Sequence, residues 1–160
     1  MTRYKVAPPA RSVEFLETAR AAIPLVPDSE ADCCGAIRRA TGVADRETAR
    51  EYLTFLRALG LVAESDRGYH RTREDLDRDS VAAAYRERVF LVAELLDAVA
   101  VRPRSAESAF EAVRDEIPNW ERQRDPDWER HWLERVDRLL AWAVLFDCLA
   151  VENDRFAPAQ

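Results

Sequence analysis

The hydrophobic periodicity of this chain changes at Gly60, and that change restricts the fold more than any other feature. Before Gly60, apolar residues recur every three or four positions, which predicts helices over residues 29–40 and 45–59. After it, residues 61–64 and 69–72 are expected to form two short strands around a turn. The sequence therefore predicts a helix, a tight turn, a second helix and a β-hairpin, in that order.

Capping residues indicate where these helices begin and end. Ser29 and Asp45 are N-cap residues, and Gly60 stands at the usual position of a helix C-terminus. An earlier helix is expected over residues 12–23, after an extended N-terminal arm. Three helices and a hairpin thus make up a first domain, expected over residues 1–75.

The second half, residues 76–160, is also expected to be mainly helical. Caps, prolines and apolar stripes predict three further helices, over residues 79–101, 105–116 and 125–147. Residues 149–156 then repeat the pattern of residues 61–69: an apolar trio, Glu, a small polar residue, Asp-Arg and an aromatic. We expect a helical C-terminal domain ending in a hairpin, with a degenerate second copy of the first domain as one interpretation.

Three runs within residues 29–72 carry the helix-turn-helix pattern: Ala36-Ile37-Arg38-Arg39-Ala40-Thr41-Gly42-Val43, Arg46-Glu47-Thr48-Ala49-Arg50-Glu51-Tyr52-Leu53 and Leu56-Arg57-Ala58-Leu59-Gly60-Leu61-Val62. In these runs residues 29–72, about 44 of the 160, resemble the winged helix-turn-helix family of transcriptional regulators. In that family a small residue precedes the turn, a glycine lies in it, and the recognition helix ends in Leu-Gly-Leu-Val before the wing. Those features are present here, although the turn has one residue more than is common, Ala44-Asp45.

The resemblance implies that helix 45–59 enters the major groove of double-stranded DNA and that hairpin 61–72 is the wing. The outward positions of this helix are Arg46, Arg50, Thr54 and Arg57. They are spaced 4, 4 and 3 residues apart and so share one stripe of the helix surface. Wing arginines would hold the flanking DNA, and arginines of the preceding helix would lie near the phosphates. The implied DNA-binding residues are Arg46, Arg50, Thr54, Arg57, Arg67, Arg71, Arg38 and Arg39.

The distribution of charge favours an anionic partner for the first half. Residues 1–73 hold 12 basic and 10 acidic side chains, whereas residues 74–160 hold 12 and 20. Against this, Glu47 and Glu51 lie beside Arg46 and Arg50, and such a mixed face is typical of solvated surface. A protein-interaction adaptor that does not bind DNA directly is therefore the alternative function.

Composition indicates the source and the compartment. Arginine makes up 23 of the 24 basic residues, and the isoelectric point is near 5.1. This bias resembles proteins of salt-loving archaea, although an acidic GC-rich bacterium fits nearly as well. The three cysteines have neither a disulfide nor a zinc spacing, and no apolar run has membrane-spanning length. We expect a cytoplasmic protein with no metal and no cofactor.

No catalytic motif is evident, and we expect no enzymatic activity. His131 follows Asp127 by four residues on one helix face, a pair that is more often a surface contact than a metal or proton-relay site. Trp128 and Trp132 favour a core, with a ligand pocket or a dimer seam as the other interpretations. The family resemblance also predicts a homodimer through the C-terminal helices.

Overall fold

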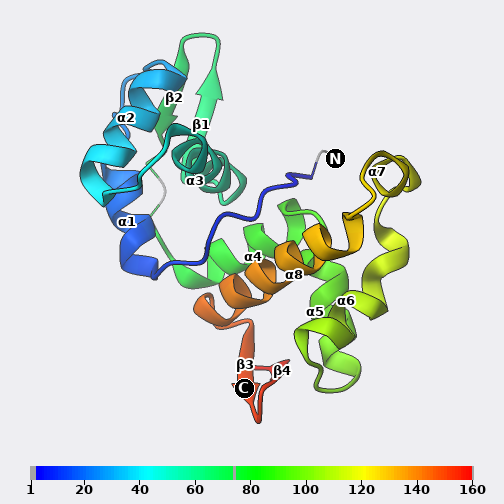
Figure 1. Ribbon diagram of the computed structural model, residues 1–160. Coiled ribbons are helices and arrows are strands. Elements are labelled where there is room, and N and C mark those ends of the chain that lie inside the picture. Colours follow the sequence, from blue (N-terminus) through cyan, green and yellow to red (C-terminus); the bar gives the residue numbers. More distant parts are fainter. Residues whose placement is uncertain (1–2, 74, 160) are drawn as a thin grey trace. The chain divides into compact units, whose positions relative to one another are not determined.

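The computed structural model describes residues 3–73 and 75–159, and it divides into two compact units. The first unit is Met1–Phe90 and the second is Leu91–Gln160. Each is mainly helical with one small antiparallel hairpin (Figure 1). By its contacts, the first unit runs on to Phe90, because the helix that follows the first hairpin packs within it.

The first unit has the expected order of helices and strands. Its elements are α1 (Val13–Ala21), α2 (Glu30–Thr41), α3 (Arg46–Ala58), β1 (Val62–Ser65), β2 (Gly68–Arg71) and α4 (Arg78–Arg88). Ser12, Ser29 and Asp45 cap α1, α2 and α3 through their side-chain oxygens, which accept backbone N–H bonds from the first turns. Gly42 and Gly60 take the left-handed conformation where α2 and α3 end.

An isolated β-bridge extends the hairpin of the first unit. Asp28 and Tyr69 exchange both backbone hydrogen bonds, at 2.9 and 2.8 Å, so the segment before α2 pairs with β2. Gly68 allows this approach because a Cβ there would lie 2.1 Å from the Asp28 carbonyl oxygen. Its φ of +123° also lies in the region that L-residues rarely adopt.

The helix expected over residues 79–101 is two helices, so that prediction was wrong. The break falls at Val89, Phe90 and Leu91, and Leu91 has a φ of +78°. Tyr4 pairs with the break: its N–H donates to the Arg88 carbonyl at 2.7 Å, and its carbonyl accepts from Phe90 N–H at 2.9 Å. The N-terminal arm thus supplies hydrogen bonds that the interrupted helix cannot make.

The second unit repeats the order of helices and hairpin with a longer connection before its last helix. Its elements are α5 (Val92–Val101), α6 (Ala106–Val113), the 3₁₀ turn η1 (Arg114–Glu116), α7 (Asn119–Arg124), α8 (Trp128–Leu145), β3 (Leu149–Glu152) and β4 (Arg155–Pro158). The sequence did not predict α7, and α8 begins later than the expected residue 125. The reason is that Asp125 accepts the N–H of Asp127 in a turn before the helix.

Candidate nucleic-acid interface

Helix α3 is held from behind by the core of the first unit. Ala49, Leu53 and Leu56 are buried against it, as are Tyr52 and Phe55. The Tyr52 hydroxyl donates to the Pro9 carbonyl at 2.5 Å, which ties the N-terminal arm to this helix. These residues anchor α3, which presents its opposite side to solvent.

The start of α3 is set by Asp45. The Asp45 carboxylate accepts the Thr48 N–H at 2.7 Å and the Thr48 hydroxyl at 3.1 Å. These two hydrogen bonds stabilise the charged form and lower the pKa of the Asp45 carboxyl. The extra turn residue noted in the sequence therefore lies outside the helix, and Arg46 is the first helical residue.

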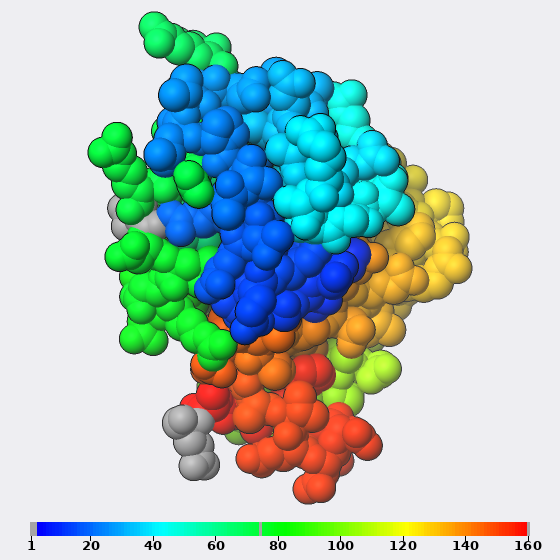
Figure 2. All heavy atoms as spheres, turned by 90° about the vertical axis from the view of Figure 1, so that its left-hand side faces the viewer, coloured from blue at the N-terminus to red at the C-terminus, as the bar shows by residue number. Residues whose placement is uncertain are grey.

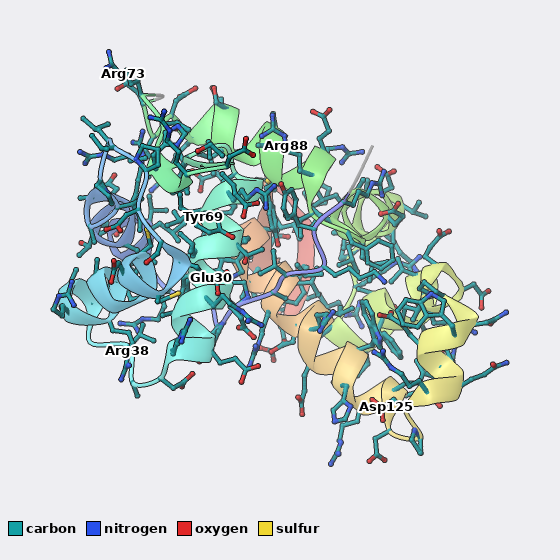
Figure 3. All side chains as sticks on the ribbon, turned by 90° about the horizontal axis from the view of Figure 1, so that it is seen from above. Glu30, Arg38, Tyr69, Arg73, Arg88 and Asp125 are labelled. Atoms are coloured by element: carbon teal, nitrogen blue, oxygen red, sulfur yellow. The ribbon has the colours of Figure 1, made fainter. Side chains whose placement is uncertain are left out.

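Arg38 is a structural part of the turn between α2 and α3. Its guanidinium donates to the carbonyls of Ala44, at 2.7 Å, and Val43, at 3.5 Å (Figure 3 shows its position near the end of α2). Gly42 N–H closes the end of α2 by donating to the Arg38 carbonyl at 2.9 Å. Arg38 thus fixes the position of α3 relative to α2 through three backbone contacts.

Arg46 and Arg50 are the free cations of α3. Both are exposed, and neither makes a hydrogen bond or an ion pair with another residue in the described part of the chain. Together with Glu47 they line a shallow surface hollow. Figure 2 shows the segment around residue 40, in cyan, at the surface of the first unit. Both also act electrostatically on Cys34: burial raises the pKa of that thiol, and the two guanidinium groups lower it.

Arg57 is engaged within the protein rather than free. Its guanidinium lies 2.8 Å from the Glu64 carboxylate on β1 and 5.5 Å from the centre of the Tyr4 ring. Glu64 also bonds the Tyr69 hydroxyl, and burial together with that bond raises the pKa of Tyr69 to about 12. Sequence reasoning missed this network, although the hairpin register places Glu64 opposite Tyr69.

The other predicted residues spread over the same unit. Arg39 on α2 and Arg67 at the tip of the wing are exposed, whereas Thr54 and Arg71 are half-buried. The Arg71 N–H donates to the Pro24 carbonyl at 2.7 Å, which holds the end of β2 against the segment after α1. The structure therefore brings Arg46 and Arg50 together, and places Arg67 on the separate hairpin.

The two units correspond position by position in their cores. At a constant separation of 76 residues, buried Leu16, Ala19 and Ile23 match Val92, Leu95 and Val99, and Cys33, Cys34 and Ile37 match Ala109, Phe110 and Val113. At a separation of 87 residues, Ala49, Leu53, Phe55 and Val62 match Val136, Leu140, Trp142 and Leu149. The strand bridge of Asp28 with Tyr69 is likewise matched by that of Arg104 with Phe156.

This correspondence corrects the sequence alignment of the two hairpins by one residue. The sequence pattern set Glu64 beside Glu152, whereas the strand positions set it beside Val151. Helices α6 and α8 thus stand where α2 and α3 stand in the first unit, and β3 and β4 form a second wing. The expectation of a second winged helix is confirmed in this topology.

His131 pairs with Asp125 rather than with Asp127. His131 Nδ1 lies 2.6 Å from Asp125 Oδ2, and this bond lowers the pKa of the Asp125 carboxyl. The pair is at the surface. Among residues 3–73 and 75–159 there is no group of three or more His, Cys, Asp or Glu placed to hold a metal ion, and no helix there is long and apolar enough to span a membrane.

Two such units in one chain define a tandem winged-helix protein. The family model described as the Halobacterial double winged helix domain matches residues 1–160, and the chain belongs to that family. It is a winged-helix family of halophilic archaea, which agrees with the source inferred from composition. No curated protein and no solved structure matches the sequence.

Proposed function

We propose that this protein binds double-stranded DNA as a transcriptional regulator. Helix α3 lies in the major groove, where Arg46 and Arg50 contact guanine edges or phosphates. The wing β1–β2 contacts the flanking DNA through Arg67, and Arg71 supports its base. The observation that carries the proposal is the pair of exposed, uncommitted arginines on a helix that is anchored along its opposite side.

The other predicted residues have supporting parts in this proposal. Arg38 holds the turn that orients α3, and Arg39 lies one residue further along α2, exposed and near the phosphates. Arg57 fixes the wing to α3 through Glu64, so it acts as a positioning residue. Thr54 continues the outward stripe, and its hydroxyl suits a base edge or a phosphate.

Salt determines how such an interface holds DNA. In ~1 M salt the Debye length is about 3 Å, so distant acidic groups hardly repel a phosphate. The same salt weakens binding that depends on counterion release. In a halophilic cell, direct hydrogen bonds from Arg46 and Arg50 to base edges therefore carry most of the affinity.

Selection from random double-stranded DNA tests the proposal. The native chain is expected to enrich one motif at graded KCl, and Arg50→Ala to lose affinity for it by about tenfold or more, the cost of one base-contacting arginine. Arg86→Ala on α4 removes the same charge from the same unit and serves as the control. Enrichment of no motif at any KCl concentration would contradict DNA binding.

The alternative function is a winged-helix adaptor that binds a partner protein. The observation in its favour is Glu47, which lines the same hollow as Arg46 and Arg50 and interrupts the positive face. If Arg50 lay in the contact with the partner protein, Arg50→Ala would weaken binding of that partner.

In the DNA-binding proposal, the C-terminal helices join two copies of the chain as a homodimer. Light scattering would measure the mass of that dimer.

A further inference from the structure

Helix α8 has no arginine at the positions that correspond to the free arginines of α3. At the positions of α8 that correspond to Arg46, Arg50 and Thr54 stand Leu133, Asp137 and Ala141. The same separation of 87 residues aligns the buried sides of α3 and α8, so these three positions lie on the side of α8 that corresponds to the arginine stripe of α3. An aspartate therefore occupies the place of the arginine on which the proposed DNA contact chiefly depends.

The first two residues of α8 contact the connection that precedes the helix. In a helix-turn-helix protein the N-terminal residues of the recognition helix reach the base edges. Here the Trp128 ring lies 5.2 Å from the Arg114 guanidinium and 5.0 Å from that of Arg122. Arg114 also pairs with Glu129 at 3.3 Å. At the end of α8 that would read bases, Trp128 and Glu129 are thus engaged with arginines of the protein itself.

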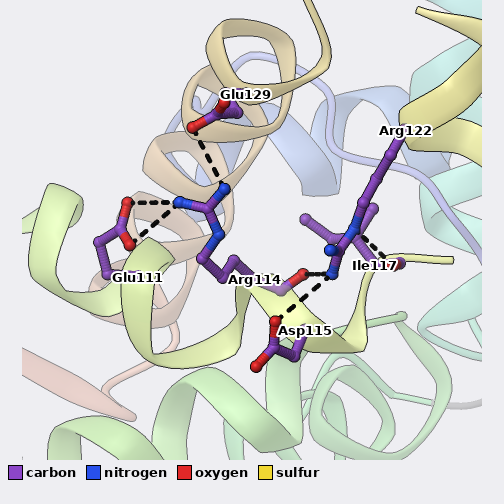
Figure 4. A network of polar contacts seen from close by, with 6 residues as sticks. All are labelled: Glu111, Arg114, Asp115, Ile117, Arg122 and Glu129. Atoms are coloured by element: carbon purple, nitrogen blue, oxygen red, sulfur yellow. Dashed lines mark hydrogen bonds and ion pairs between the residues drawn. The ribbon is translucent and has the colours of Figure 1, made fainter. Parts of the chain in front are cut away.

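Backbone contacts hold that connection in place (Figure 4). Arg122 donates to the carbonyls of Ile117, at 3.1 Å, and Arg114, and its guanidinium lies 3.8 Å from the Asp115 carboxylate. Arg114 is further held by Glu111 at 3.1 Å. In the second unit these contacts stand in place of the short turn that joins α2 to α3 in the first. That short turn leaves Arg46 exposed at the start of α3.

The charge of the second unit also opposes phosphate. Residues 91–160 contain 9 arginines and 15 acidic residues, a net charge of −6, whereas residues 1–90 contain 15 of each sign. At the hairpin tip Glu152 and Asp154 flank Asn153, and Arg155 follows. Val151, 55% exposed, stands where Glu64 of the first wing anchors Arg57.

We infer that one chain engages DNA through the first winged helix alone, and that α8 and the hairpin β3–β4 contact neither bases nor phosphates. This inference rests on the proposed function and assigns it to one of two topologically equivalent sites. The tandem fold then presents one recognition helix per chain. A second DNA-binding helix requires a second copy of the protein.

Matched substitutions in the full chain test this inference. The probe is a fluorescein-labelled duplex carrying the motif enriched by the native protein, titrated by anisotropy at several KCl concentrations. The pairs are Arg67→Ala with Arg155→Ala, one arginine at each hairpin, and Arg50→Ala with Asp137→Ala, one equivalent position on each helix. Circular dichroism of each variant verifies that it is folded.

The two members of each pair are expected to differ. Arg50→Ala and Arg67→Ala weaken binding by about tenfold, and Arg67→Ala reduces the slope of log affinity against log salt by about 0.9. Arg155→Ala leaves both affinity and slope unchanged, as does Asp137→Ala. A loss of affinity in Arg155→Ala equal to that in Arg67→Ala, or tighter binding by Asp137→Ala, would overturn the inference while leaving DNA binding intact. An unbound duplex with the native chain would overturn the proposed function as well.

Discussion

Tyr69 shows how one side chain joins the wing to the rest of the first unit. Its hydroxyl bonds Glu64, its backbone pairs with Asp28, and burial is the main cause of its raised pKa. Because the folded-state pKa of about 12 lies above the ordinary value of 10.0, the neutral phenol stabilises the fold below pH 10. That contribution is lost as the pH rises through about 12.

We therefore expect the alkaline titration of the native protein to include a late phenol that belongs to Tyr69. Ultraviolet absorbance of the phenolate measures it, and Tyr69→Phe is expected to remove one phenol that titrates near pH 12. In urea, where the fold is lost, the four tyrosines should titrate together near pH 10. If Tyr69→Phe instead removed a phenol with the ordinary pKa near 10, the burial of Tyr69 and its bond to Glu64 would be contradicted.

Asp45 offers a test of how the start of α3 is determined. Because its pKa is lowered in the folded state, its carboxylate stabilises the fold above the ordinary value of 3.8, and that contribution is lost as the pH falls below it. Asp45→Ala is expected to lower the thermal midpoint at pH 7, and the effect should become smaller as the pH falls below 3.8. Asp45→Asn keeps an N-cap acceptor and should remain close to the native midpoint at pH 7. Equal losses in both variants would indicate that the cap does not set this helix.

For single residues, the sequence predicted which arginines lie outside the core. It did not predict which of them pair with an acidic side chain. Helical spacing placed Arg46, Arg50 and Arg57 on one stripe, and that stripe does face away from the buried residues. It could not show that Arg57 is paired, because its partner Glu64 belongs to another element and meets it only after the hairpin folds. Pairing across elements depends on tertiary register, which local periodicity does not contain.

At the scale of elements, the link between α3 and the wing is the Arg57–Glu64 pair. If Arg57 contacted DNA directly, Glu64→Gln would release it and strengthen binding. We expect the opposite in ~1 M KCl, where long-range charge effects are screened: Glu64→Gln frees the wing and weakens binding of the enriched duplex. Asp66→Asn at the hairpin tip removes the same charge without touching Arg57 and is the control. Tighter binding by Glu64→Gln in anisotropy titrations would make Arg57 a DNA contact.

The bridge between Asp28 and Tyr69 in the first unit depends on Gly68. Gly68→Ala would place a Cβ 2.1 Å from the Asp28 carbonyl oxygen, so the strand pairing must open. We expect a loss of about 1–3 kcal/mol in the free energy of unfolding, measured by urea titration. Gly42 also has a positive φ, but nothing lies within 4 Å of its missing Cβ, so Gly42→Ala is expected to cost about 1 kcal/mol. Equal costs would mean that φ alone, without the clash, accounts for both glycines.

The break between α4 and α5 shows what element prediction lacks. Val89, Phe90 and Leu91 continue an apolar helical pattern, and no proline or glycine interrupts it. The interruption depends on Tyr4, which is some 85 positions away in sequence and supplies the hydrogen bonds of a bridge at Val89. By contrast, α1 to α3 were predictable because their caps and breakers are local: Ser12, Ser29, Asp45 and Gly60 lie within or beside the helices they bound.

At the scale of the whole molecule, the sequence reveals the second winged helix mainly through its hairpin. The repeated Asp-Arg-aromatic pattern marks the two hairpins, whereas the matching helices differ in most side chains. Their likeness lies in which positions are buried, and the connection over residues 114–127 changes the separation from 76 to 87 residues between α6 and α8. A repeat with an insertion of this kind is hidden from pattern comparison because no single shift aligns both parts.

The two units differ in net charge and in the aromatic side chains by which their unfolding can be followed. All four tryptophans lie in the second unit, which has a net charge of −6, and all four tyrosines lie in the first, whose charges balance. Raising KCl from ~0.1 M to ~1 M shortens the Debye length from about 10 Å to about 3 Å and so reduces repulsion among the acidic residues. We expect the thermal midpoint followed by tryptophan fluorescence to rise more than the midpoint followed by tyrosine absorbance. Glu152→Gln combined with Asp154→Asn should reduce the rise of the midpoint that tryptophan fluorescence follows. If that midpoint did not change with KCl, repulsion within the second unit would not limit its stability.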